Sequence, residues 1–595
     1  MQETRGYEKT WDLDVIFPGG SESKEFEDYL QKLESKMKDL SNSVNYYDPK
    51  GQNSALELVE IVTILEATMK KLRESFAFIS CLSAQNVKDV GANLLTGRRS
   101  TLGAKMGSIQ TILNQKLAII PEEKWLEIVN HESLQDISFV LNERREAAQE
   151  LLSSEQEILL NDLSVDGYHA WGQMYETIVG NMTVELEENG ALNLYSIGQA
   201  SNKLSSPDPE FRKYVFEQIS KAWEKNIDLF GQTLNHLAGF RLQKYKHRGW
   251  DNVLKEPLSM NRMNQETLDA MWNAITKNKH HFVKYLTKKA ELLGKDKLSI
   301  YDINAPLTKT VKTVSFTEGA NFIMKHFREF SPKMANFAKM AFEKRWIEAE
   351  DRPGKRPGGF CTSFPDSEQT RVFMTYSGTS SNISTLAHEL GHAYHQYVMN
   401  DVHGLNQGYA MNVAETASTF AEMIVADASV LNAKDKQEKL ELLEDKVQRS
   451  IAFFMNIHAR FVFETRFYEE RKKGIVSVKR LNELMLDAQK ETYCEALEEY
   501  DPAFWASKLH FHITSTPFYN FPYTFGYLFS LGIYAHAKRS NESFEDNYIA
   551  LLRDTGRMKV EDLAWKHLKV DLTKSDFWEA AMELCVKDVE EFISL

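Results

Sequence analysis

The sequence predicts a mostly helical protein. Three observations predict this: apolar residues recur at helical spacing over most of the chain, glycine and proline are sparse, and only one stretch alternates clearly as a strand does. The chain has 595 residues with 29 glycines and 14 prolines, and 43% of its residues are hydrophobic while 26% are charged. These proportions are typical of a globular protein rich in regular structure, and they exclude fibrous and disordered classes.

Helical periodicity occurs in both halves of the chain. Apolar residues are separated by Glu and Lys at intervals of three and four, which is the pattern of helices that bury one face. The clearest runs are residues 26–40, 55–87, 137–163 and 439–468.

Turn-forming residues divide the chain unevenly. Ser205-Ser206-Pro207-Asp208-Pro209 precedes a new series of amphipathic segments, and the first of these is predicted to begin as a helix at Pro209. We therefore predict two domains, a helical N-terminal domain over residues 1–204 and a larger second domain over residues 205–595.

Net charge and cysteine usage exclude several classes of protein. The formal charge is -14, which argues against a nucleic-acid-binding surface because neutralising phosphates requires an excess of Lys and Arg. The four cysteines are widely spaced, so neither a disulfide framework nor a thiolate zinc site is predicted. The first residues lack a basic start followed by an apolar run, so no secretory signal is visible and we expect a cytoplasmic protein.

One long segment is free of charge. No Asp, Glu, Lys or Arg occurs between Lys508 and Lys538, but Pro517 and Pro522 interrupt the apolar run. A membrane-spanning helix needs about 20 consecutive, predominantly apolar residues. We predict that this segment is buried inside the protein and that the chain has no membrane partner.

The clearest strand candidate covers residues 370–376, where Val372, Met374 and Tyr376 alternate with residues of the opposite face. Turn and capping residues follow it, and a helix is predicted from Ser384 to Met399. We therefore expect a small β-sheet beside this helix.

The predicted helix carries His388-Glu389-Leu390-Gly391-His392, which matches the H-E-x-x-H pattern of zinc peptidases. At about 100° per residue, the two histidines lie about 40° apart, so both imidazoles can reach one ion. Glu389 lies about 100° from His388 by the same geometry. Its carboxylate can therefore meet a water on the metal without being a ligand.

A third ligand is predicted from the segment Asn412 to Glu422. Catalytic zinc commonly takes two His and one Glu and leaves its fourth position for water. We choose Glu415 as this ligand, whereas Glu422 is either a partner that orients a histidine or an ordinary solvated Glu. His395 is disfavoured, because a continuous helix places it about 10.5 Å along the axis from His388.

These residues predict hydrolysis through a metal-activated water, with Glu389 as the general base that passes a proton to the departing amine. The developing oxyanion needs further donors. If a helix opens at Pro522, Tyr523 and Tyr527 share one of its faces. Candidate donors in the charge-free segment are His510, His512, Tyr519, Tyr523 and Tyr527.

At these residues the chain resembles the thimet oligopeptidase family of zinc metallopeptidases, and within it the oligoendopeptidase F branch. The resemblance rests on Leu386 to His395, on Ala414-Glu415 with Ala417-Ser418, and on a tyrosine-rich tail ending in Gly526-Tyr527. It extends from Ser205 to the C-terminus, and the first third resembles the family's helical N-terminal region.

The resemblance implies an elongated, mostly α, zincin-like peptidase with a deep internal channel. It implies one zinc ion held by His388, His392 and Glu415, with Glu389 as the base. It also implies a tail histidine and tyrosines that stabilise the tetrahedral intermediate, assigned here to His510, Tyr523 and Tyr527. The spacing of the tail differs from the family pattern, so the choice between His510 and His512 and the role of Tyr519 stay open.

The function predicted for residues 205–595 is therefore a zinc-dependent endopeptidase that cleaves internal bonds of short, unfolded oligopeptides. The strand over residues 370–376 is expected to offer an open edge that pairs with the substrate backbone.

Two alternatives remain. A carboxypeptidase or aminopeptidase on a similar scaffold would cleave only peptides with free ends. A helical binding protein with a structural zinc would need a closed site of four ligands. Cleavage preference and oligomeric state are not predicted.

Overall fold

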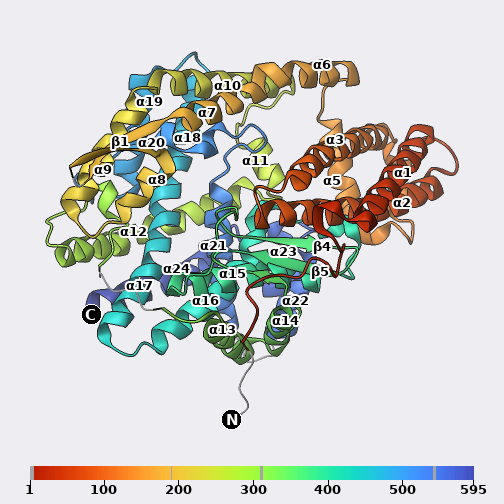
Figure 1. The fold of residues 1–595 in the computed structure, drawn as a ribbon. Coiled ribbons are helices and arrows are strands. Elements are labelled where there is room, and N and C mark those ends of the chain that lie inside the picture. Colours follow the sequence, from red (N-terminus) through yellow and green to blue (C-terminus); the bar gives the residue numbers. More distant parts are fainter. Residues whose placement is uncertain (1–5, 189, 308–312, 540–543) are drawn as a thin grey trace, which may run out of the picture.

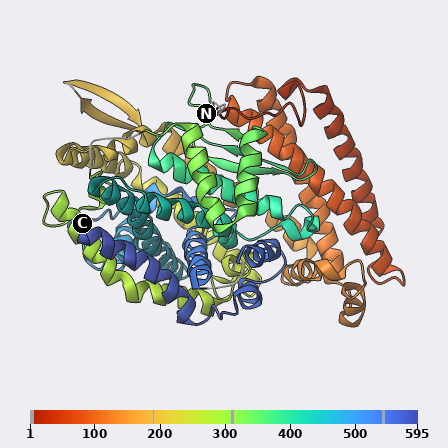
Figure 2. The same cartoon turned by 90° about the horizontal axis from the view of Figure 1, so that it is seen from below.

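The computed structural model describes residues 6–188, 190–307, 313–539 and 544–595. Helices make up nearly all of the regular structure, and a small sheet lies beside the helix that carries the H-E-x-x-H motif, as predicted. Figure 1 shows the first helices, in red and orange, gathered at one end of an elongated body. Figure 2 shows the same helices from below as a layer alongside the rest of the molecule.

The first helices are long and amphipathic. Ser23 caps α1 by accepting a hydrogen bond from the backbone of Phe26, and the helix then buries residues at intervals of three and four, including Leu30 and Leu33. The helices before residue 205 are α1 Lys24–Tyr46, α2 Ser54–Gln85, α3 Val90–Ala118, α4 Glu122–Val129, α5 Ser138–Gln149, α6 Ser154–Ser164, α7 Ala170–Asn181 and α8 Ile197–Asn202. Of these, α7 and α8 pack with the larger body (Figure 1).

The remaining helices build the larger body. As predicted, α9 begins at Pro209, and Asp208 caps it. The helices are α9 Pro209–Glu224, α10 Ile227–His247, α11 Lys255–Met260, α12 Gln265–Leu292, α13 Phe316–Phe330, α14 Pro332–Glu343, α15 Ser380–Val398, α16 Met411–Leu431, α17 Lys436–Ile451, α18 Ile457–Arg471, α19 Val478–Thr492, α20 Phe504–Ser507, α21 Phe521–Arg539, α22 Phe544–Asp554, α23 Val560–Leu568 and α24 Ser575–Ser594.

The strand predicted over residues 370–376 is β5 Gln369–Phe373, and it lies in the middle of a three-stranded sheet rather than at an edge. It pairs in parallel with β3 Ile347–Glu348 and antiparallel with β4 Phe360–Phe364. The expectation that this strand offers an open edge is therefore wrong. A tight turn through Glu368, at a φ of 53°, folds β4 onto it, so β4 is an edge instead.

A second sheet is the hairpin of β1 Thr183–Glu188 and β2 Ala191–Ser196. Gly190, at a φ of 77°, lies in its turn, where a glycine relieves the strain of the left-handed conformation.

Buried side chains form two hydrophobic clusters. One is built from residues 11–141 together with Phe364, Phe373 and Leu405. The other spans residues 175–592, so the small sheet joins the N-terminal helices to the larger body. The domain boundary near Ser205 stays a prediction.

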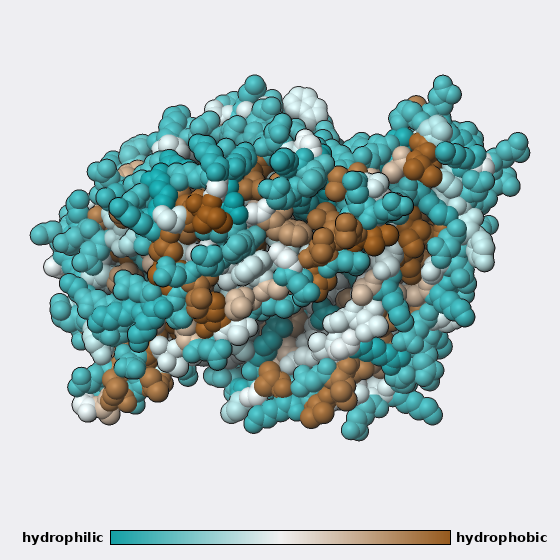
Figure 3. Space-filling view, turned by 90° about the horizontal axis from the view of Figure 1, so that it is seen from above, coloured by the Kyte–Doolittle hydropathy of each residue, from teal (hydrophilic) through white to brown (hydrophobic). Residues whose placement is uncertain are grey.

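The charge-free segment is buried, as predicted. Most of its residues belong to α21, and fourteen residues of this helix are buried among neighbouring helices. Within the described part of the chain, no helix combines the length and apolar character that crossing a membrane requires. Figure 3 shows a mostly hydrophilic surface from above, with hydrophobic residues gathered in patches around a hollow near the middle of this face.

Candidate active site

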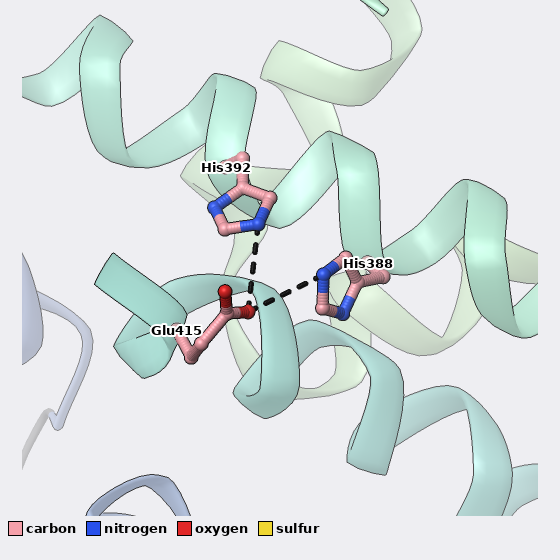
Figure 4. A group of neighbouring side chains, drawn as sticks. All are labelled: His388, His392 and Glu415. Atoms are coloured by element: carbon pink, nitrogen blue, oxygen red, sulfur yellow. Dashed lines mark ion pairs between the residues drawn. The ribbon is translucent and has the colours of Figure 1, made fainter. Parts of the chain in front are cut away.

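The start of helix α15 is fixed by a capping box, and this helix carries the first two ligand candidates. Thr379 and Asn382 form a capping box, so α15 begins four residues before the predicted start at Ser384. His388 and His392 then lie one turn apart on the same face, with ring centroids 4.8 Å apart. Both imidazoles point toward α16, as Figure 4 shows.

Gly391 lets α16 approach the histidine face closely. A Cβ at this position would lie 2.5 Å from the carbonyl oxygen of Ala417 and 2.6 Å from the Cα of Ser418. Only glycine permits such contact between two helix backbones without a shift. This close approach brings Glu415, on the first turns of α16, opposite the two histidines.

The carboxylate of Glu415 meets both imidazoles. Its Oε2 lies 3.3 Å from Nε2 of His388 and 3.5 Å from Nε2 of His392 (Figure 4). One ligand atom from each of the three residues lies within 4.8 Å of the others. The hydroxyl of Ser418 donates to the same Oε2 at 2.8 Å, which fixes the orientation of the carboxylate.

Glu422 contacts the other ring nitrogen of His388. Its Oε2 lies 3.2 Å from Nδ1 of the imidazole, and its other oxygen pairs with Arg449 on α17. Burial alone would lower the pKa of His388, but the hydrogen bond to Glu422 and the charges of Glu422, Glu415 and Glu389 raise it to about 9. Glu422 is thus a largely buried partner of His388 and not a solvated side chain.

His392 lies in a different environment. Burial lowers its pKa to about 4, while the nearby charge of Glu415 opposes the shift. A neutral imidazole is the form in which histidine binds a metal.

Glu389 is 7% exposed and lies beside the ligand candidates. Its Oε2 is buried without a hydrogen-bond partner among the described residues. Burial, and secondarily the charges of Glu415 and Glu422, raise the pKa of its carboxyl to about 7, against the effect of His388. A carboxyl in this range suits a general base at neutral pH.

The tail brings His510, Tyr519 and Tyr523 together. The rings of His510 and Tyr519 lie 5.3 Å apart, and the hydroxyl of Tyr523 lies 3.5 Å from that of Tyr519. Burial and Tyr519 raise the pKa of Tyr523, and the charge of Glu415 adds to the shift.

A second close glycine contact aligns α21 with α16. A Cβ on Gly526 would lie 2.8 Å from the Cβ of Glu415, so the two helices touch at the ligand candidate itself. Tyr523 precedes Gly526 by three residues, which places it on the same face of α21.

Two other tail residues lie elsewhere. His512 is 1% exposed and stacks on Tyr175 at 3.9 Å between ring centroids, so it is an interior residue and His510 is the histidine beside Tyr519. Tyr527 shares a helix with Tyr523, but its hydroxyl lies 3.1 Å from that of Ser450 and contacts the thiol of Cys585. The structure does not bring Tyr527 into the Tyr519–Tyr523 pair.

His395 points away from the two ligand histidines. Its Nε2 lies 2.9 Å from the hydroxyl of Thr555, and its ring stacks on Tyr409 at 4.3 Å. Burial lowers its pKa to about 3. This position agrees with the prediction that His395 is not a ligand.

Sequence reasoning missed the residues that fix the candidate ligands, chiefly Ser418 and Arg449. Arg449 reaches Glu422 from another helix, so no local pattern reveals it. Gly391 and Gly526 are the usable signals, because a glycine inside a helix often marks a close backbone contact.

Comparison with known proteins identifies relatives over the whole chain. The profile described as Peptidase family M3 matches residues 203–584, and one described as Oligopeptidase F matches residues 116–183. Oligopeptidase PepF of Bacillus subtilis is 24% identical, over 99% of this chain and 87% of that protein. An oligoendopeptidase F homolog of Lactococcus lactis is also 24% identical, over 98% of this chain and 97% of that protein.

Solved structures share the fold. A putative peptidase from Chlamydophila abortus superposes with a TM-score of 0.85 at 17% identity, covering 98% of each chain. Oligoendopeptidase-F from Enterococcus faecium gives a TM-score of 0.68 at 18% identity, covering 95% of this chain and 99% of that one.

Proposed function

Because this chain belongs to peptidase family M3, and is thus a metalloendopeptidase, we propose that it uses one zinc ion to cleave internal bonds of short oligopeptides. The observation that carries the proposal is the convergence of His388, His392 and Glu415, whose ligand atoms lie within 4.8 Å of one another.

The donor set fits zinc. Two imidazoles and one carboxylate are the ligands that catalytic zinc commonly takes, and their side chains are 20–26% exposed, so the site stays open to solvent and substrate. The buried, unpartnered oxygen of Glu389 beside them also fits a site built for a cation and its water. When bound, zinc would supply Lewis-acid chemistry to a water and to the substrate carbonyl.

Glu389 is proposed as the general base. Its carboxyl lies next to the ligands on α15, is mostly buried, and has one oxygen free to accept a proton from the attacking water. The same carboxyl can then protonate the departing amine. Glu422 and Arg449 would hold His388 in position, and Ser418 would hold Glu415.

The outer edge of β4 is proposed to pair with the substrate backbone. β4 pairs only with β5 among the described strands, and edge strands recognise extended peptides through their free backbone groups. At the start of β4, a Cβ on Gly359 would lie 3.2 Å from Oε1 of Glu389. A peptide along this edge would therefore pass the proposed base.

His510, Tyr519 and Tyr523 are proposed to stabilise the oxyanion, with Tyr527 as the competing candidate from the sequence. Tyr523→Phe should lower kcat at least about tenfold, because it removes one hydrogen-bond donor to the developing charge. Tyr527→Phe is the matched comparison and should lower kcat much less, since its hydroxyl contacts Ser450. Steady-state kinetics on one peptide measures both. A larger loss for Tyr527→Phe would reverse the assignment.

Terminally blocked peptides test the function itself. The zinc-loaded protein should cleave a mixture of short blocked peptides at internal bonds, a chelator should abolish cleavage, and zinc should restore it. Mass spectrometry of the products identifies the bonds that are cut. Cleavage restricted to peptides with free ends would favour the carboxypeptidase or aminopeptidase alternative, and no cleavage at all would refute the proposal.

A further inference from the structure

A cavity lies between the N-terminal helices and the larger body. Its volume is about 640 Å³. Helices α2, α3 and α5 supply one wall, and the end of α15 with the following segment supplies the other. Its polar lining includes Arg73, Glu143, Arg144, Arg262, Gln396 and Tyr409.

The cavity carries an excess of positive charge. Three arginines line it against one glutamate, Glu143, and Arg262 neutralises that glutamate through two hydrogen bonds of 2.7 Å. Neither Arg73 nor Arg144 forms an ion pair with a carboxylate of the described residues. Such a surplus stands out in a chain whose net charge is -14.

Both of these guanidinium groups are held only by neutral acceptors. Arg73 donates to Gln407 at 3.1 Å, to Ser363 at 3.3 Å and to Gln396 at 3.4 Å. Arg144 makes a single long hydrogen bond of 3.4 Å, to Asn114. Each guanidinium has five donor hydrogens, so both retain donors that can bind a further group.

Burial makes these unpaired charges costly. It lowers the pKa of Arg73, against the effect of Tyr409, and it lowers the pKa of Arg144, against the effect of Glu143. A partly buried cation without a counter-charge is most stabilised by an anion that accepts two hydrogen bonds, and a carboxylate matches the planar guanidinium geometry.

The cavity lies at the C-terminal end of the helix that carries the two ligand histidines. Gln396 follows His392 by one turn on α15, so it lies on the same face of the helix. Its side-chain amide donates to the hydroxyl of Tyr409, and the charge of Glu415 contributes to the raised pKa of that tyrosine. Helix α15 thus carries both the two ligand histidines and a residue that lines the cavity.

Strand β4 links the two sites. Gly359, before the strand, lies beside Glu389, and Ser363, four residues later, accepts a hydrogen bond from Arg73. At about 3.3 Å per residue, this separation is about 13 Å along a strand. A peptide paired with β4 would present a residue about four positions from the scissile bond to Arg73.

We propose that Arg73 and Arg144 form a subsite for a carboxylate of the peptide substrate, about four residues from the bond that is cut. This inference rests on the proposed endopeptidase function. The carboxylate belongs either to an acidic side chain or to the chain terminus, since both present the same two oxygens. The N-terminal helices thereby take part in selecting the substrate.

A peptide scan tests the subsite. Blocked peptides carry one Glu at successive positions around the cut bond, and each has a counterpart with Gln at that position. A second set places the free terminal carboxylate, or its amide, at the same positions. The wild type should show a kcat/KM ratio of at least about ten for one position, which is the preference expected of one charge-assisted pair.

Two variants locate that preference. Arg144→Gln should bring the ratio close to one, and Arg73→Lys should lower it partly, because lysine keeps the charge but loses the forked geometry. The control Arg328→Gln, on the exposed surface of α13, should keep the full ratio. Either variant alone tests the subsite if the other fails to fold.

The outcomes of the scan and of the variants fall into three kinds. A preference for the acidic side chain or for the free terminus supports the subsite and identifies its source. A wild type that cleaves every blocked peptide without preference overturns the subsite, as does a full ratio in Arg144→Gln. Failure to cleave even the neutral blocked peptides would instead refute the proposed function, so the two failures are distinct.

Discussion

Glu389→Gln should lower kcat by about 100- to 10,000-fold on a blocked peptide, because it removes the proton acceptor and leaves the rest of the site in place. The amide is nearly the same size as the carboxylate and is a far weaker base. Zinc content should stay at that of the wild type, since Glu389 is not one of the three ligand candidates.

Parallel measurements of kcat and of bound zinc check this result. Glu176→Gln, an exposed position on α7, is the matched control and should change neither quantity. Loss of zinc in Glu389→Gln would mean that this residue is a ligand. Full activity in the zinc-loaded variant would mean that another group takes the proton.

Glu415→Ala should lower the affinity for zinc at least about 100-fold, more than is typical of changing a residue that only orients a ligand. Without this carboxylate, the ion would be bound by two imidazoles alone and would lose one ligand atom and one negative charge. Peptide hydrolysis should fall with zinc occupancy.

Glu422→Gln provides the graded comparison. Glu422 contacts His388 but would not contact the ion, so its loss should lower zinc affinity only about 10- to 100-fold. Binding to the folded state raises stability by about 2.7 kcal/mol when free zinc is 100 times its Kd. Thermal unfolding with and without zinc therefore measures affinity independently of activity. Equal zinc affinity in Glu415→Ala and the wild type would exclude Glu415 as a ligand.

The sequence pattern predicted those features of the structure that depend only on residues close together in the chain. Helical spacing predicted the face shared by His388 and His392, and turn residues predicted the start of α9 at Pro209. The absence of charged residues between Lys508 and Lys538 predicted a buried segment, because apolar runs are usually buried and unpaired charges rarely are.

Contacts between distant segments were not predictable in the same way. The alternation of apolar and polar residues predicted strand β5. It could not predict that β4 pairs with β5, because that pairing depends on the turn between the two strands. Tyr523 and Tyr527 share a helical face, yet their hydroxyls contact Tyr519 and Ser450 respectively. The arginine cavity requires five separate segments to meet, so no single stretch of sequence indicates it.

Anomalous diffraction at the zinc absorption edge, from crystals of the zinc-loaded protein, tests the central claim most directly. One strong peak should lie about 2.0–2.2 Å from Nε2 of His388, Nε2 of His392 and a carboxylate oxygen of Glu415. A peak elsewhere, or one coordinated without Glu415, would contradict the account.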